Sequence, residues 1–94
     1  SSDLYDSGKI YLFSDDLKVF NSKDLKLEKT VDTGNDYINM YNLSGDILLV
    51  KKTGYVLIEK SSFTMKEFSA EILDSIKSED SVYLILKDRY KKIK

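Results

Sequence analysis

The side chains of this chain that could do chemistry are mainly carboxylates, tyrosines and lysines, because its 94 residues include neither His nor Cys. Without imidazole the chain lacks the commonest general base and the commonest transition-metal ligand. Without Cys it lacks thiolate nucleophiles, disulfides and Cys-based zinc sites. Catalytic triads that depend on His are therefore excluded, and acid–base chemistry on carboxylates or binding by aromatic and basic groups remains.

One carboxylate stands in a short motif, Asp32-Thr33-Gly34. The motif resembles the core of the aspartic proteases, in which two carboxylates, one from each half of a dimer, share a proton and activate water. The resemblance implies a homodimeric hydrolase that uses Asp32. Asn35 stands where the family has Ala or Ser, and only Gly54 lies near the place expected for a glycine-rich flap. A turn between two strands explains the motif through ordinary Asx and Gly preferences, and we favour that interpretation.

Pairs of acidic residues could supply oxygen ligands to calcium at three places, Asp15 with Asp16, Asp32 with Asp36, and Glu79 with Asp80. None of them follows the alternating Asp-Xaa-Asp-Xaa-Asp-Gly pattern that surrounds the ion with oxygens. We therefore interpret these groups as solvated turn residues, and we expect no metal ion and no cofactor.

The segment 87–94 is the one locally basic stretch of the chain. In an extended strand its side chains alternate, so that Tyr90, Lys92 and Lys94 share one face and Arg89, Lys91 and Ile93 the other. An edge strand protected by lysine explains the segment without a ligand. Over the whole chain 15 basic residues balance 16 acidic ones, which argues against nucleic acid as a partner. The predicted binding residues combine this segment with two tyrosines in turn-like contexts: Tyr5, Tyr37, Arg89, Tyr90, Lys91 and Lys92.

The elements that would position these side chains are short β-strands. Three apolar runs, at 10–13, 47–50 and 82–86, continue through both parities of the two-residue period, as in strands covered on both faces. A polar turn follows each run, and a second strand then begins at Leu17, Tyr55 or Tyr90. The chain therefore contains one hairpin pattern three times.

The similarity continues beyond the hairpin. Polar breaks at 21–24 and 59–62 each precede an apolar residue, Leu25 or Phe63, after which a third strand fits. Such spacing is typical of a structural repeat whose units cannot bury their apolar faces alone. The period of about 35 to 38 residues predicts units at approximately 8–44, 45–81 and, in part, 82–94.

Two segments resemble the repeats of β-propellers such as the WD-repeat, NHL and YVTN-type families: Ser-Gly-Lys-Ile-Tyr-Leu-Phe at 7–13 and Ser-Gly-Asp-Ile-Leu-Leu-Val at 44–50. Blades of these proteins are four-stranded antiparallel sheets stacked around a channel. The Gly-His and Trp-Asp signatures of WD repeats are absent from this chain. The resemblance implies an all-β fold of antiparallel meander repeats and a role in scaffolding or protein binding.

An α+β fold is the alternative, because Thr-Met-Lys-Glu at 64–67 matches a helix capping box. Phe68, Ile72 and Ile76 follow at four-residue spacing, which favours an amphipathic helix over 64–77. On the repeat hypothesis the same residues form two strands. The two hypotheses therefore differ in whether the chain contains a helix.

A propeller closes with about four blades or more, so two and a half repeats leave sheet faces and edges to be covered. We expect the chain to be part of a larger propeller, with the remaining blades, a protein partner or a second copy covering them. No apolar run approaches the roughly 18 residues that span a bilayer. The expected function is a non-catalytic scaffold or protein-interaction module. The alternatives are a homodimeric hydrolase using Asp32 and a small α+β binding domain.

Overall fold

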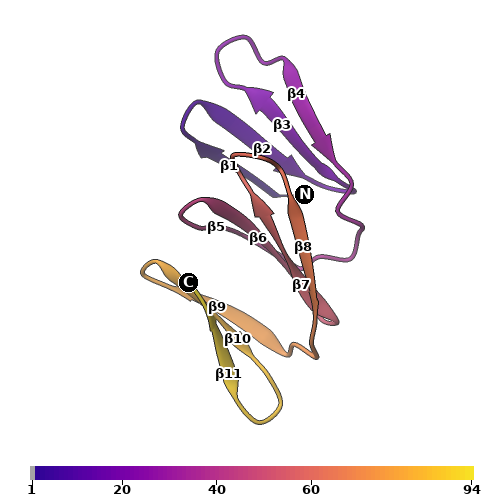
Figure 1. Cartoon of the computed structure of the whole chain (residues 1–94), viewed down its shortest axis with the longest axis vertical. Helices are drawn as coiled ribbons and strands as arrows, with labels where there is room; N and C mark the ends of the chain where they lie inside the picture. The colour runs from indigo at the N-terminus through magenta and orange to yellow at the C-terminus, as the bar shows by residue number, and fades with distance from the viewer. Residues whose placement is uncertain (1) are drawn as a thin grey trace. The chain divides into compact units, whose positions relative to one another are not determined.

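The computed structural model describes residues 2–94, which form eleven strands in three antiparallel sheets (Figure 1). The fold of these residues is therefore all-β, as expected. Nothing in this part of the chain forms a helix that could cross a membrane. The chain divides into two compact units, Ser1–Asn35 and Asp36–Lys94.

The first unit is a four-stranded meander in which strands adjacent in sequence pair with each other. Its strands are β1 (Ser2–Asp6), β2 (Lys9–Phe13), β3 (Leu17–Asn21) and β4 (Leu27–Val31). Ser7 and Gly8 connect β1 to β2 with positive φ angles of 50° and 81°, which suit a tight hairpin turn.

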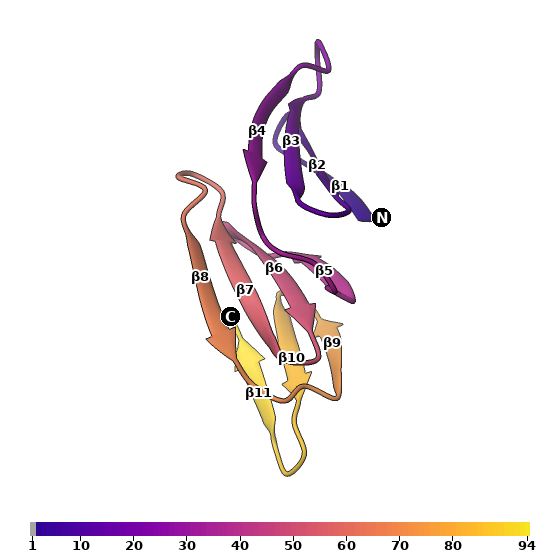
Figure 2. The same cartoon turned by 90° about the vertical axis from the view of Figure 1, so that its right-hand side faces the viewer.

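The second unit contains two sheets (Figure 2). The first is again a four-stranded meander of β5 (Asn39–Asn42), β6 (Asp46–Lys51), β7 (Gly54–Glu59) and β8 (Met65–Ser69). The second is a three-stranded meander of β9 (Asp74–Ser78), β10 (Ser81–Ile85) and β11 (Tyr90–Ile93).

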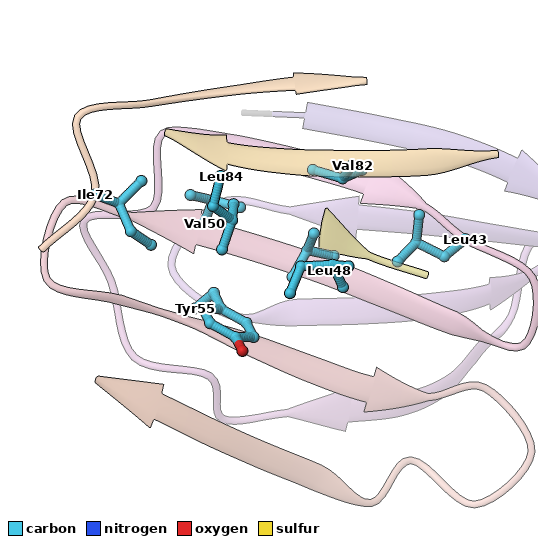
Figure 3. Packing of buried hydrophobic residues seen from close by; sticks show 8 residues of the cluster. Leu43, Leu48, Val50, Tyr55, Ile72, Val82 and Leu84 are labelled. Atoms are coloured by element: carbon cyan, nitrogen blue, oxygen red, sulfur yellow. The ribbon is translucent and has the colours of Figure 1, made fainter. Parts of the chain in front are cut away.

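The core of the second unit lies between its two sheets. Val82 and Leu84 of β10 pack with Leu48 and Val50 of β6 (Figure 3). The buried cluster is completed by Leu43, Tyr55, Ile72 and Ile93. The two sheets of this unit therefore stack face against face, because each has an apolar face that must be covered.

The prediction that all three apolar runs are covered on both faces is only partly correct. β6 is buried throughout its apolar run, with Ile47 and Leu49 as well as Leu48 and Val50 at 0 % exposure. β10, in contrast, alternates between buried and partly exposed residues. No further sheet of this unit covers the second face of β10, so that face stays open.

The helix proposed for 64–77 is wrong, because these residues form β8 and β9. The chain reverses at Phe63, whose φ is 59° and whose N–H donates to the Glu59 carbonyl at 2.7 Å. Phe68 then pairs with Tyr55 on β7, and their rings stack with centroids 4.7 Å apart. Cross-strand pairing and stacking therefore override the four-residue spacing of three apolar side chains.

The three sheets share one strand register. In each, the first, second and third strands contribute one residue to a row of directly opposite partners. The three rows are Tyr5, Ile10 and Phe20; Asn42, Ile47 and Ile58; and Lys77, Val82 and Ile93. Two residues are called equivalent below when they lie on corresponding strands, the same number of positions from these rows and in the same direction.

Candidate protein-interaction surface

The basic segment identified in the sequence forms the last strand of the three-stranded sheet. Tyr90, Lys91 and Lys92 belong to β11, which lies at one edge of the sheet in the order β11-β10-β9. Arg89 precedes the strand, and its carbonyl accepts the N–H of Leu86 at 2.8 Å, which closes the β10–β11 turn. Four of the six predicted binding residues are thus brought together at one sheet edge.

The alternation predicted for this strand is present. Ile93 is 6 % exposed and belongs to the core between the sheets, whereas Tyr90 is 67 % exposed. Lys91 shares the inner face with Ile93, and its Nζ lies 5.5 Å from the Tyr55 ring centroid and 5.9 Å from that of Phe68. A cation over an aromatic face is attracted by the ring quadrupole, so Lys91 is held against the neighbouring sheet.

The side of the three-stranded sheet turned away from the core carries four neighbouring apolar side chains, together with the charged Lys92 and Asp74. Tyr83 lies opposite Ile76 on β9, and Ile85 lies opposite Tyr90 on β11. The rings of Tyr83 and Tyr90 meet edge to face at 5.8 Å. Ile76 is 52 % exposed. We call Ile76, Tyr83, Ile85 and Tyr90 the outer face of the β9–β11 sheet.

The equivalent surface of the β5–β8 sheet is the one that packs in the core of this unit. Its side chains at the positions of Ile76, Tyr83, Ile85 and Tyr90 are, in that order, Tyr41, Leu48, Val50 and Tyr55. All four belong to the core cluster or pack against it. The outer face therefore has an apolar residue at four of the positions that the preceding sheet uses for stacking, whereas Lys92 stands at the position of Leu57, which also packs against the core.

The two remaining predicted contact residues lie elsewhere. Tyr5 belongs to β1 of the first unit and is 65 % exposed, so the expectation of a turn-like context was wrong. Its pairing with Ile10 on β2 explains the extended conformation. Tyr37 precedes β5 and is half-buried. Lys51 Nζ lies 5.0 Å from its ring centroid. Burial raises the pKa of Tyr37, and the negative charge of Glu67 adds to the effect.

The second unit also has a depression of about 230 Å³. Its lining residues come from the segment before β5 and from the β6–β7 turn: Asp36, Ile38, Lys51, Lys52 and Thr53. Opposite charges face the depression together, so no single sign of charge dominates it. The side chains of the outer face, in contrast, are all apolar or aromatic.

Asp32 has a structural partner within its own turn. Its Oδ1 accepts the N–H of Gly34 at 3.3 Å, the arrangement of an Asx turn, and Gly34 has a φ of 78°. Thr33 is 3 % exposed and donates to the Gly34 carbonyl at 3.1 Å. Gly54 lies in β7 against the backbone of Phe68, where an added Cβ would meet the Phe68 carbonyl oxygen at 2.2 Å. These observations fit the turn interpretation of the motif.

Acidic residues elsewhere also serve local structure. Asp16 pairs with Lys18 at 2.9 Å, and Glu79 adopts a positive φ of 56° in the β9–β10 turn. Within residues 2–94, no three acidic side chains gather as a group that could hold a metal ion.

Two features of the second unit were missed in the sequence. Ser75 is 8 % exposed, and its Oγ lies 2.8 Å from Asn39 Nδ2 and 2.6 Å from the hydroxyl of Tyr41. This polar link between β5 and β9 has no sequence signal, because 34 or more residues separate the partners. The outer face had a signal, namely that Ile76 and Ile85 align with Tyr41 and Val50 of the preceding sheet.

No protein-family model, curated protein or solved structure matches the chain. The geometry of the outer face and of the β11 edge therefore carries the functional argument.

Proposed function

We propose that this chain is a non-catalytic interaction module made of propeller-blade-like sheets, and that its outer face binds a further sheet of the same kind. The observation that carries the proposal is the equivalence of this face with the packed face of the β5–β8 sheet. Tyr90 corresponds to Tyr55, which is 3 % exposed, and Tyr83 corresponds to Leu48, which is 0 % exposed. The same positions are thus buried in one sheet and, in the next, partly exposed at Tyr83 and largely exposed at Tyr90.

Repetition at the level of hydrogen bonds supports the blade-like character of the sheets. Ser22 N–H donates to the Gly8 carbonyl, and Lys60 N–H donates to the Gly45 carbonyl, both at 3.0 Å. These bonds tie the turn after the third strand to the turn before the second strand in both four-stranded sheets. Stacked four-stranded meanders of one register are the building plan of propellers, in which each blade covers its neighbour.

The partner that fits the outer face is the β1–β4 sheet of a second copy. Within the second unit, the surface that packs on the β5–β8 sheet carries Val82, Leu84 and Ile93. Their equivalents in the first unit are Ile10, Leu12 and Phe20, which are aliphatic or aromatic and only half-buried. A second copy therefore presents a surface of the same kind as the one that packs on the β5–β8 sheet within the second unit. Two copies would supply six sheets, within the four to eight blades of propellers.

The test is the concentration dependence of the molecular mass, measured by sedimentation velocity and equilibrium on the whole chain. We expect reversible association of the wild-type chain. Ile76→Lys should weaken it roughly 10-fold or more, because a lysine on the outer face must lose its hydration when the sheets meet. Ser69→Lys is the matched control, since it adds the same charge at an exposed position of β8. A wild-type chain that stays monomeric at every concentration, or equal effects of both variants, would overturn the proposal.

A further inference from the structure

The third strands of the three sheets differ in whether a fourth strand pairs with their outer edge. β3 pairs with β4 and β7 pairs with β8, so both four-stranded sheets have a fourth strand. β11 is equivalent to β3 and β7, and among the described residues no strand pairs with its outer edge. We propose that this edge accepts an extended acidic segment of a partner protein as a fourth, antiparallel strand. The site shares Tyr90 with the outer face, but it uses the main-chain groups at the edge of β11 and goes beyond the function proposed above.

The main-chain groups available at this edge follow from one hydrogen bond. The Arg89 carbonyl points toward β10, because it accepts the N–H of Leu86. Main-chain groups alternate in direction along an antiparallel strand. The N–H and C=O of Lys91 therefore also point toward β10, and those of Tyr90 and Lys92 point away from it. Their N–H and C=O groups are unpaired by any strand of the described chain, which is the requirement for strand addition.

In the two four-stranded sheets, the residues equivalent to these outward positions are the ones that pair with the fourth strand. Asn21 donates its N–H to the Lys26 carbonyl and Glu59 donates its N–H to the Thr64 carbonyl, both at 2.9 Å. Asn21 and Glu59 are equivalent to Lys94, which has the same parity as Tyr90 and Lys92. The direction inferred for β11 thus agrees with both internal examples.

The complete sheets also indicate which side chain should lie opposite Tyr90. Phe68 on β8 lies opposite Tyr55, and the two rings are nearly parallel, at 12°. Val31 on β4 lies opposite Leu17, and both are buried. Since Tyr55 and Leu17 are the equivalents of Tyr90, an incoming strand should place an aromatic or aliphatic residue there. That residue would cover a ring that is 67 % exposed.

The positive charges on β11 favour an acidic segment as the incoming strand. The positions next to Tyr90 are Lys91 and Lys92, whose equivalents on β7 are Val56 and Leu57. Directly opposite pairs of unlike charge stabilise antiparallel strands, and pairs of like charge destabilise them. The lysines therefore keep the edge from pairing with arbitrary strands and favour a segment with two consecutive carboxylates followed by an apolar residue.

The probe is a capped peptide, Thr-Met-Glu-Glu-Phe-Ser, which copies β8 and the residue before it, with glutamate in place of Lys66. In the β8 register its glutamates lie opposite Lys92 and Lys91, and its phenylalanine lies opposite Tyr90. Amide hydrogen exchange, resolved by residue with NMR on the whole chain, should slow about 10-fold at Tyr90 and Lys92 and stay unchanged at Lys91. The matched control peptide, Thr-Met-Lys-Lys-Phe-Ser, should bind about 10-fold more weakly.

Lys92→Pro is the decisive variant, because it removes an outward N–H and leaves the pairing with β10 intact. Peptide binding should be lost, and unchanged exchange at Leu84 would show that the sheet still folds. Ile76→Lys should leave peptide binding unchanged, since Ile76 lies on the strand at the opposite edge. This separates strand addition from docking on the outer face. Equal binding of both peptides, no protection at Tyr90 and Lys92, or undiminished binding to a folded Lys92→Pro variant would overturn the proposal.

Discussion

Leu25 and Phe63 lie at the same step of two turns and share a left-handed backbone conformation, with φ angles of 60° and 59°. Leu25 donates its N–H to the Asn21 carbonyl at 2.9 Å, and Phe63 donates to the Glu59 carbonyl at 2.7 Å. This conformation costs a residue with a Cβ about 1–2 kcal/mol. Leucine and phenylalanine disfavour this backbone conformation. Both turns are therefore stabilised by their hydrogen bonds and by the register of the flanking strands.

Replacing Leu25 tests this relationship. Leu25→Gly should raise the free energy of unfolding by about 0.5 kcal/mol, since relief of the strained φ exceeds the extra chain entropy that glycine brings to the unfolded state. Little packing is lost, because Leu25 is 65 % exposed. Leu25→Val should lower the free energy of unfolding by about 1 kcal/mol, because β-branched residues tolerate positive φ poorly. Urea unfolding measures both variants, and a loss of stability in the glycine variant would contradict the argument.

The strands were largely predictable because their signal is local. The apolar runs at 10–13 and 47–50 lie within β2 and β6, and the run at 82–86 lies within β10 except for Leu86, which follows it. The segment 64–77 was ambiguous, since its apolar spacing suits a helix as well as two strands. Pairing with the strands next in sequence, β7 for β8 and β10 for β9, decides between them, and a helix pattern within 64–77 alone does not contain that information.

The candidate surface was predictable only in part. The alternation of Tyr90 and Lys91 across two faces follows from strand geometry alone. The exposure of Ile76 and Ile85 could not be predicted, because both faces of a sheet with apolar runs look alike in sequence. Which face stays open depends on the number of sheets that stack, and this is a property of the whole unit.

The hydroxyl of Ser75 should make a measurable contribution to the stability of the second unit. Ser75→Ala leaves the amide of Asn39 and the hydroxyl of Tyr41 without this partner between two sheets. An unsatisfied buried group costs about 1–3 kcal/mol, and we expect a loss of about 2 kcal/mol in the free energy of unfolding. Ser78→Ala on the same strand is the control, because Ser78 is exposed, and it should change stability by less than about 0.5 kcal/mol. Equal effects would show that the polar link contributes nothing.

Gly54 should tolerate no side chain. A Cβ at this position would lie 2.2 Å from the carbonyl oxygen of Phe68, and a backbone atom cannot move aside as a side chain can. Gly54→Ala should therefore destabilise the chain by about 1–3 kcal/mol as β7 and β8 separate. Gly34→Asn is the matched control: nothing lies within 4 Å of its Cβ position, and Asn adopts its φ of 78° readily. Thermal unfolding that ranks the two variants equally would refute the steric argument.

Asp32 should act through its turn and without catalysis. Asp32→Asn keeps a side-chain oxygen that accepts the Gly34 N–H, so the free energy of unfolding should change by less than about 0.5 kcal/mol. Asp32→Ala removes the acceptor and should cost about 1 kcal/mol. Peptide cleavage in the acid range should be undetectable for the wild type. Cleavage that is present in the wild type and abolished by Asp32→Asn would establish the hydrolase instead.

Glu59 gives the chain a pH dependence whose sign can be stated. Its Oε1 accepts hydrogen bonds from the hydroxyls of Ser61 at 2.8 Å and Ser62 at 3.0 Å, and these bonds lower its pKa below the usual 4.5. Because the folded state holds the carboxylate more strongly, its contribution to stability is fully present above the unfolded pKa. It is lost as the pH falls through the lower, folded pKa.

The expected result is a Glu59 carboxyl signal that titrates below pH 4.5 in an NMR titration of the folded chain. Removing both hydroxyls in Ser61→Ala/Ser62→Ala should return the pKa toward its usual value, since the hydrogen bonds exceed the opposing effects of burial and of the negative charge on Asp46. Glu59→Gln should destabilise the chain more at pH 7 than at a pH below the folded pKa of Glu59, where the wild-type carboxylate is itself protonated. A pKa that does not rise in the double variant would mean that another group stabilises the Glu59 carboxylate.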